Sequence, residues 1–129
     1  GGFNTFIPLV YQKENNYLNV TEFPTGQEIL KTFAISRILL DNIPHLKAYW
    51  VTSSINLALI AQEYGADDLD GTIQKESINS AAGAKSANGM ELNQFVHLIK
   101  DSGFIPVERD SLYNELNYPN IRYNSTKKG

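Results

Sequence analysis

Polar side chains stand where we expect strands to end, and they are the residues best placed to bind a small molecule. Thr52 and Ser53 follow an apolar run, so their hydroxyls would lie at a helix N-terminus, where anions are favoured. Asp70 and Thr72 flank Gly71 at the end of a shorter strand candidate, and a glycine there allows a ligand to approach the backbone closely. These positions predict a ligand site. Ordinary helix capping and a plain turn would explain the same residues.

Two further charged residues complete this candidate set. Arg109 follows an apolar stretch, and an arginine can hold a carboxylate through two parallel hydrogen bonds. It could equally pair with Glu108 or Asp110 at the surface. Glu76 could contact a substrate or could simply begin a helix, whose dipole favours an acidic residue there.

Several kinds of chemistry are excluded for this segment. The chain has no cysteine, so it supplies no disulfide, thiolate metal site or iron–sulfur ligand. His45 and His97 lack metal-ligand spacing, and we expect packing or solvated roles for both. There is no glycine-rich phosphate loop and no nucleophile elbow. The net charge of −3 favours no nucleic acid partner, and no apolar run has the length of a membrane span.

Apolar runs and helical periodicities alternate along the chain. Thr25 and Glu28 have the spacing of a capping box and predict a helix start. We expect strands over 3–10 and 46–51, with a weaker candidate over 68–73. We expect helices over about 25–40, 52–65 and 88–103, a short one over 77–82, and an extended piece over 104–108.

This alternation predicts an α/β fold. Strands separated by helices favour parallel βα units with right-handed crossovers. Three such units cannot close a barrel, so they would be the last part of an eight-stranded barrel or a small open α/β domain.

Five segments carry a resemblance to a known family. The strings FIPLVYQKEN, SRILLDNIPHLKAYWV, YGADDLDGT, ESINSAAGA and FIPVERDSLYN resemble the C-terminal part of the aminofutalosine synthases. These are radical S-adenosylmethionine enzymes of the futalosine route to menaquinone. The resemblance runs from about Gly2 to Asn114. The cyclic dehypoxanthine futalosine synthases and the deazaflavin synthase subunits share a similar frame. The cyclases tend to read L-G-S-T where this chain reads L-D-G-T at 69–72.

The resemblance implies a fold and a missing half. Residues 1–116 would be the C-terminal part of a TIM-like radical S-adenosylmethionine barrel, made of three βα units and an extended segment. Residues 117–129 would be a flexible tail. The family's C-x-x-x-C-x-x-C loop, which binds the [4Fe–4S] cluster, is not in this chain. The chain does not begin with Met, so we interpret it as a C-terminal piece. Because it lacks the cluster loop, we expect it to be inactive alone.

The resemblance also implies an activity for the intact enzyme. An electron from the cluster cleaves S-adenosylmethionine to methionine and the 5′-deoxyadenosyl radical. The radical adds to the enol-ether double bond of 3-[(1-carboxyvinyl)oxy]benzoate, and rearrangement with loss of carbon dioxide gives aminofutalosine. Phe6, Ile7 and Pro8 would lie near the adenine of the cofactor. The substrate would meet the residues introduced above: Thr52, Ser53, Asp70, Thr72, Glu76 and Arg109.

Other expectations concern partners and location. The partner would be a small-molecule substrate, with no nucleic acid and no membrane, and the location would be cytoplasmic. The open strand edges of a partial barrel favour self-association of the piece. Another enzyme of the same family and a stand-alone α/β binding module remain the alternatives.

Overall fold

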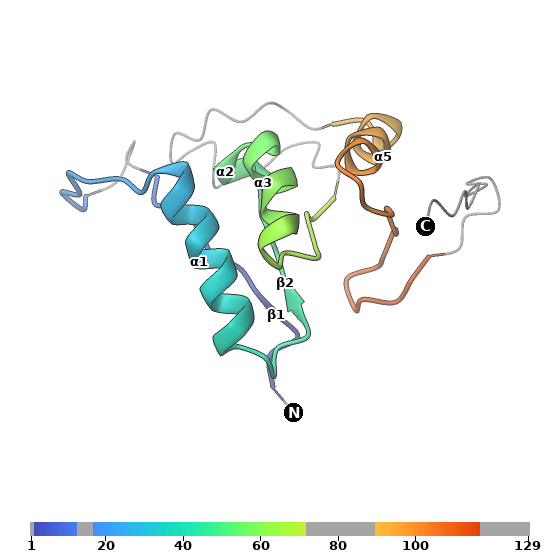
Figure 1. Cartoon of the computed structure of the whole chain (residues 1–129), viewed down its shortest axis with the longest axis horizontal. Coiled ribbons are helices and arrows are strands. Elements are labelled where there is room, and N and C mark those ends of the chain that lie inside the picture. The colour runs from blue at the N-terminus through green and yellow to red at the C-terminus, as the bar shows by residue number, and fades with distance from the viewer. Residues whose placement is uncertain (1, 13–16, 72–89, 117–129) are drawn as a thin grey trace.

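Short strands and helices alternate along the part of the chain that the structure describes. The computed structural model describes residues 2–12, 17–71 and 90–116. Its elements are β1 (Thr5–Phe6), α1 (Gly26–Leu39), β2 (His45–Leu46), α2 (Trp50–Ser53), α3 (Ile55–Ala61), the 3-10 helix η1 (Gln62–Tyr64) and α5 (Leu92–Asp101) (Figure 1). The expected mixture of helix and strand is confirmed.

The strands are parallel, as the alternating pattern predicts. β1 pairs with β2 in parallel, with Thr5 opposite His45 and Phe6 opposite Leu46. One residue further on, Lys47 forms a parallel bridge with Asp68, so a third segment lies beside β2. The helix α1 connects β1 to β2, as a crossover should. The described residues form an open sheet, without a closed barrel.

Every strand is shorter than expected. The expected strand 3–10 pairs only over β1, and Pro8 beyond it has no N–H to donate to a ladder. The expected strand 46–51 is wrong at its end, because Trp50 begins α2. A short apolar run can be a buried strand or a buried helix, and the indole N–H of Trp50 donates to the carbonyl of Gly71 at 3.1 Å. The expected third strand is a single bridge at Asp68.

The core lies on one side of the parallel segments. Side chains alternate across a strand, so Leu46 and Ala48 share one face and Lys47 takes the other. The first face belongs to the core, which it forms together with residues of α1, α3 and α5. The buried residues of this core are Phe33, Leu46, Ala48, Trp50, Val51, Ala58, Ala61, Ala66, Leu69 and Phe95. The second face therefore carries the charged residues of the sheet.

Helix caps decide where α1 and α3 begin. The predicted capping box is confirmed: Glu28 N donates to Thr25 Oγ1 at 3.2 Å, and Thr25 N donates to Glu28 Oε2 at 2.7 Å. The cap of α3 is Ser54, whose Oγ accepts from Leu57 N at 3.3 Å. We expected residues 52–54 to supply this cap. Ser54 confirms the prediction, whereas Thr52 and Ser53 lie inside α2.

The C-terminal segment packs α5 against the core. Phe95 of α5 lies 6.2 Å from Trp50, ring centroid to ring centroid. The helix ends as predicted near Gly103, but Glu91 at its start makes no side-chain cap bond. Residues 104–108 form no strand, and Arg109 bridges Glu115 in antiparallel fashion instead. The predicted cap at residue 88, the short helix 77–82 and the tail 117–129 lie outside the described residues. No described helix is long and apolar enough to span a membrane.

Gly65 offers a stability test of the turn between η1 and the third parallel segment. Its φ is +101°, and a Cβ there would lie 2.7 Å from Cβ of Arg37. We expect Gly65→Ala to lower the free energy of unfolding by about 1–3 kcal/mol, because the positive φ is strained for alanine and its Cβ would clash with Arg37. Urea unfolding measures this change. The matched control is Gly26→Ala, where a Cβ makes only an ordinary 3.6 Å contact with Leu57, and an equal loss there would contradict the expectation.

Candidate functional site

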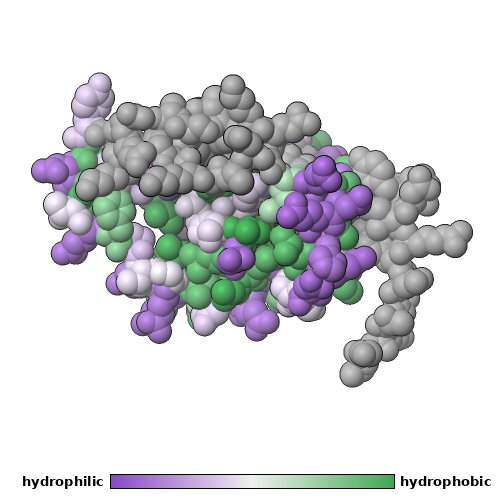
Figure 2. All heavy atoms as spheres, turned by 90° about the horizontal axis from the view of Figure 1, so that it is seen from above, coloured by the Kyte–Doolittle hydropathy of each residue, from purple (hydrophilic) through white to green (hydrophobic). Residues whose placement is uncertain are grey.

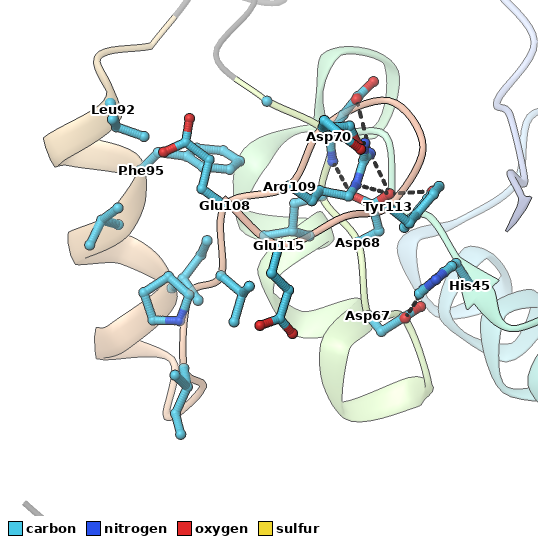
Figure 3. Close-up of a pocket in the computed structure, with 18 of the residues that line it drawn as sticks. His45, Asp67, Asp68, Asp70, Leu92, Phe95, Glu108, Arg109, Tyr113 and Glu115 are labelled. Carbon is cyan, nitrogen blue, oxygen red and sulfur yellow. Dashed lines mark hydrogen bonds and ion pairs between the residues drawn. The ribbon is translucent and has the colours of Figure 1, made fainter. Parts of the chain in front are cut away.

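A buried carboxylate organises the charged face of the sheet. The side chain of Asp68 is only 7 % exposed. Its Oδ2 accepts hydrogen bonds from Arg109 Nε at 3.1 Å, Arg109 Nη2 at 2.6 Å and the hydroxyl of Tyr113 at 2.6 Å (Figure 3). These donors come from the segment after α5, so Asp68 joins that segment to the sheet.

Asp70 lies next to this cluster, at the carboxyl end of the third parallel segment. Its backbone N–H donates to Asp68 Oδ1 at 2.9 Å. Its own Oδ1 lies 3.3 Å from Lys47 Nζ and 3.6 Å from Arg109 Nη2. The side chain is 33 % exposed, the most accessible of these four charged residues. Two cations and two carboxylates thus meet on one face, and Asp70 is the member that solvent or a ligand reaches.

A second set of contacts extends the cluster toward the start of β2. His45 stacks on Tyr113, with ring centroids 3.9 Å apart and planes 10° apart. His45 Nδ1 lies 2.7 Å from Asp67 Oδ2, and Arg37 Nη2 donates to Asp67 Oδ1 at 3.1 Å. The guanidinium carbon of Arg109 lies 4.1 Å from the centre of the Tyr113 ring. His45 therefore has a structural role, as expected.

The electrostatics follow from burial and hydrogen bonding. Burial alone raises the pKa of Asp68, but hydrogen bonds from Tyr113, the Asp70 backbone and Arg109 outweigh it and bring the pKa below its ordinary value. Burial and the neighbouring Asp68 raise the pKa of Tyr113 to about 12. At neutral pH the cluster therefore holds a charged Asp68 and a neutral Tyr113.

A cavity of about 530 Å³ opens beside the cluster, between α5 and the following segment. Phe95 and Ile99 form part of its apolar wall, and Asp68, Asp70 and Arg109 form part of its polar wall. Figure 3 shows the carboxylate of Glu108 on the Phe95 side, away from the Asp68 cluster. The space has the mixed lining of a small-molecule site.

The expected substrate residues fall into three groups. Asp70 and Arg109 are brought together. Thr52 and Ser53 lie in α2, where both hydroxyls donate to the carbonyl of Tyr49, at 3.2 and 3.1 Å. Thr72 and Glu76 lie outside the described residues.

The expected cofactor residues, Phe6, Ile7 and Pro8, lie at the carboxyl end of β1. The carbonyl of Phe6 accepts from Lys47 N at 2.9 Å, so it belongs to the sheet. The side chains of Phe6 and Ile7 are about one third exposed, at 37 % and 36 %. They offer an apolar surface at the end of the sheet where ligands of parallel α/β folds gather.

Sequence reasoning missed three members of the site. The predicted set did not include Asp68, Lys47 and Tyr113. Arg109 pairs with the carboxylate of Asp68, and its contact with the neighbouring Asp110 is a hydrogen bond to the backbone carbonyl at 2.9 Å. A detectable signal was present in the sequence. Asp68 lies with Asp67 and Asp70 in a segment where a strand was expected, and an acid that becomes buried in a strand needs a partner.

The residues of this chain do not fit an iron–sulfur cluster. There is no cysteine in the sequence, and the described residues contain no group of three or more histidine, aspartate or glutamate side chains that could hold a metal ion. Any cluster in the intact protein would need ligands from outside this chain.

Comparison with known proteins identifies the family. The model of the "CofH/MqnC C-terminal region" matches residues 1–122. The chain belongs to this family. Within the CofH/MqnC family, it is 41% identical over 120 residues to the aminodeoxyfutalosine synthase of Thermus thermophilus, a match of 90% of this chain and 32% of the relative.

Two other relatives, named for different reactions, match the chain with similar sequence identity. The chain is 38% identical to the cyclic dehypoxanthine futalosine synthase of Streptomyces coelicolor, over 90% of this chain and 29% of the relative. It is 40% identical to the 5-amino-6-(D-ribitylamino)uracil–L-tyrosine 4-hydroxyphenyl transferase of Archaeoglobus fulgidus, over 90% of this chain and 34% of the relative. The chain thus spans about a third of the length of these relatives. The resemblance to the family drawn from the sequence is confirmed.

Proposed function

We propose that this chain is the C-terminal part of an aminofutalosine synthase, a radical S-adenosylmethionine transferase of menaquinone biosynthesis. The match of nearly the whole chain to this family, at 41% identity to one such synthase, is the observation that carries the proposal. By the resemblance drawn from the sequence, L-D-G-T at 69–72 favours this choice within the family, because that resemblance implies glycine for the cyclases where this chain has Asp70. The alternative is another reaction of the family.

The proposed place of the chain is the last part of a TIM-like barrel. Its parallel segments would continue a sheet that begins in the rest of the protein. In such a barrel the carboxyl ends of the strands face the substrate. The residues at 6–8 would then meet the adenosyl group, and Asp70 and Arg109 would face the dianionic substrate, with Thr52, Ser53, Thr72 and Glu76 as further candidates.

The proposed division of labour concerns binding and orientation. A [4Fe–4S] cluster, held elsewhere in the protein, would supply the electron that cleaves S-adenosylmethionine. This chain would hold the substrate beside the adenosyl carbon and exclude water. Alone, it would be inactive, and the intact enzyme would be cytoplasmic.

The test is the product of the intact protein after reconstitution of its cluster. With S-adenosylmethionine, a reductant and 3-[(1-carboxyvinyl)oxy]benzoate, we expect aminofutalosine, which contains the adenosyl group, by mass spectrometry. Parallel reactions contain dehypoxanthine futalosine, or 5-amino-6-(D-ribitylamino)uracil with L-tyrosine. If the protein converts only dehypoxanthine futalosine, or only 5-amino-6-(D-ribitylamino)uracil with L-tyrosine, it belongs to the reaction of that substrate and the proposed function is wrong.

We also propose that the isolated chain self-associates. Among the described residues β1 pairs only with β2, so one edge of the sheet lacks a partner strand. Phe3 and Leu9 beside it are 80 % and 65 % exposed. Figure 2 shows that apolar atoms also reach the surface on another face, seen from above. We expect sedimentation of the chain to show dimers or larger species at high concentration. A compact monomer under those conditions would contradict the partial-barrel proposal.

A further inference from the structure

We propose that Asp68 and Tyr113 are positioning residues that act through Asp70. The inference rests on the proposed function, in which Asp70 faces the substrate. Neither residue needs to touch the substrate for this role. What they control is where the carboxylate of Asp70 lies.

The first link is the backbone of Asp70. Its φ is +67°, in the left-handed region that most residues avoid. The hydrogen bond from Asp70 N to Asp68 Oδ1, at 2.9 Å, closes an Asx turn, in which an aspartate side chain accepts from the backbone N–H two residues later. Asp68 thus selects the backbone conformation from which the Asp70 side chain projects.

The second link is the side chain of Asp70. Arg109 Nη2 lies 2.6 Å from Asp68 Oδ2 and 3.6 Å from Asp70 Oδ1. Lys47 Nζ lies 3.9 Å from Asp68 Oδ2 and 3.3 Å from Asp70 Oδ1. Each cation therefore lies between the buried carboxylate and the accessible one. The buried carboxylate of Asp68 therefore holds Arg109 and Lys47 in place, and these two cations fix the position of the accessible Asp70 carboxylate.

The third link is Tyr113, which fixes Asp68. Its hydroxyl donates to Asp68 Oδ2 at 2.6 Å, the same oxygen that Arg109 uses. Its ring contacts the guanidinium of Arg109 and stacks on His45. Tyr113→Phe removes the hydroxyl and keeps the ring, so it disturbs the Asp68 carboxylate while it retains the packing.

The test is a double-mutant cycle in the intact protein. We expect Tyr113→Phe to change KM for 3-[(1-carboxyvinyl)oxy]benzoate about fivefold, because the loss of the hydrogen bond to Asp68 moves the Asp70 carboxylate, whose negative charge acts on the two carboxylates of the substrate. KM for S-adenosylmethionine should change little. Asp70→Asn removes the charge through which Tyr113 acts. If the inference holds, adding Tyr113→Phe to Asp70→Asn changes KM by less than about twofold, because residues that act through one another are not additive.

The control is Tyr64→Phe, at an exposed tyrosine on η1, and it should leave both KM values unchanged. Equal effects of Tyr113→Phe with and without Asp70 would overturn the inference, and so would the absence of any effect. If the unmutated protein uses another substrate of the family, the proposed function fails and the same cycle is measured with that substrate.

A second measurement needs no turnover. In the intact protein without its cluster, we expect Tyr113→Phe to move the NMR signal of the Asp70 amide, because that N–H donates to Asp68. Tyr64→Phe should leave the signal in place. An Asp70 amide that is unaffected by the loss of the Tyr113 hydroxyl would overturn the inference whatever the substrate is.

Discussion

Replacing Asp68 with alanine should lower the free energy of unfolding of the chain by about 3–5 kcal/mol, because it removes the buried carboxylate and leaves the partly buried Arg109 without its nearest counter-charge. Arg109 and Tyr113 both donate to this carboxylate, and the Asp70 backbone donates to its second oxygen. Urea unfolding followed by the fluorescence of Trp50, the one tryptophan of the chain, measures the loss.

The matched control for this prediction is an aspartate in a surface pair. Asp101 is 63 % exposed and lies 3.0 Å from His97 on α5. Asp101→Ala should cost less than about 0.5 kcal/mol, since exposed pairs contribute little. A loss at Asp68 no larger than the loss at Asp101 would show that the cluster does not hold the segment after α5 on the sheet.

The same cluster makes stability depend on pH at both extremes. The pKa of Asp68 is lower in the folded state than its ordinary value of 3.8, so its contribution is present above that value and is lost as pH falls through the folded pKa. The pKa of Tyr113 is raised from 10.0 to about 12, so its contribution is present below 10 and is lost as pH rises toward 12. Tyr113→Phe should remove the alkaline part of this dependence in urea unfolding curves.

Under the proposed function, replacing Arg109 with lysine should lower the amount of aminofutalosine formed per 5′-deoxyadenosine released by the intact protein about tenfold. A lysine keeps the charge but loses the fork that contacts Asp68 through two nitrogens and reaches toward Asp70. S-adenosylmethionine cleavage should continue, because the expected cofactor residues lie at the carboxyl end of β1 and not beside Arg109. Arg109→Ala should lower the ratio at least as far.

Arg37→Lys is the control for the arginine change. Arg37 donates to Asp67 and to the carbonyl of Gly65, next to the core and away from Asp70. It should reduce stability and leave the product ratio unchanged. An unchanged ratio in both Arg109 variants would mean that Arg109 has a structural role alone.

Local signals determined which elements form and in what order. The Thr25–Glu28 box places the start of α1, because both of its hydrogen bonds are made between residues three apart. Gly65 and Gly103 end their helical segments with positive φ, which glycine adopts without steric cost. The parallel direction of the strands followed from the alternation of strand and helix, and the family from strings that span most of the chain.

The lengths of the strands and the partners of the charges were decided by tertiary structure. Trp50 begins a helix where a strand was expected, and its indole bonds the carbonyl of Gly71, 21 residues further along the chain, a contact that no local pattern contains. Arg109 stands beside two acids in the sequence, yet its guanidinium pairs with Asp68, 41 residues away. A buried carboxylate such as that of Asp68 needs a positive partner, and this partner can come from any part of the chain that the fold brings close. The tertiary structure therefore paired Arg109 with Asp68, although Glu108 and Asp110 are its neighbours in the sequence.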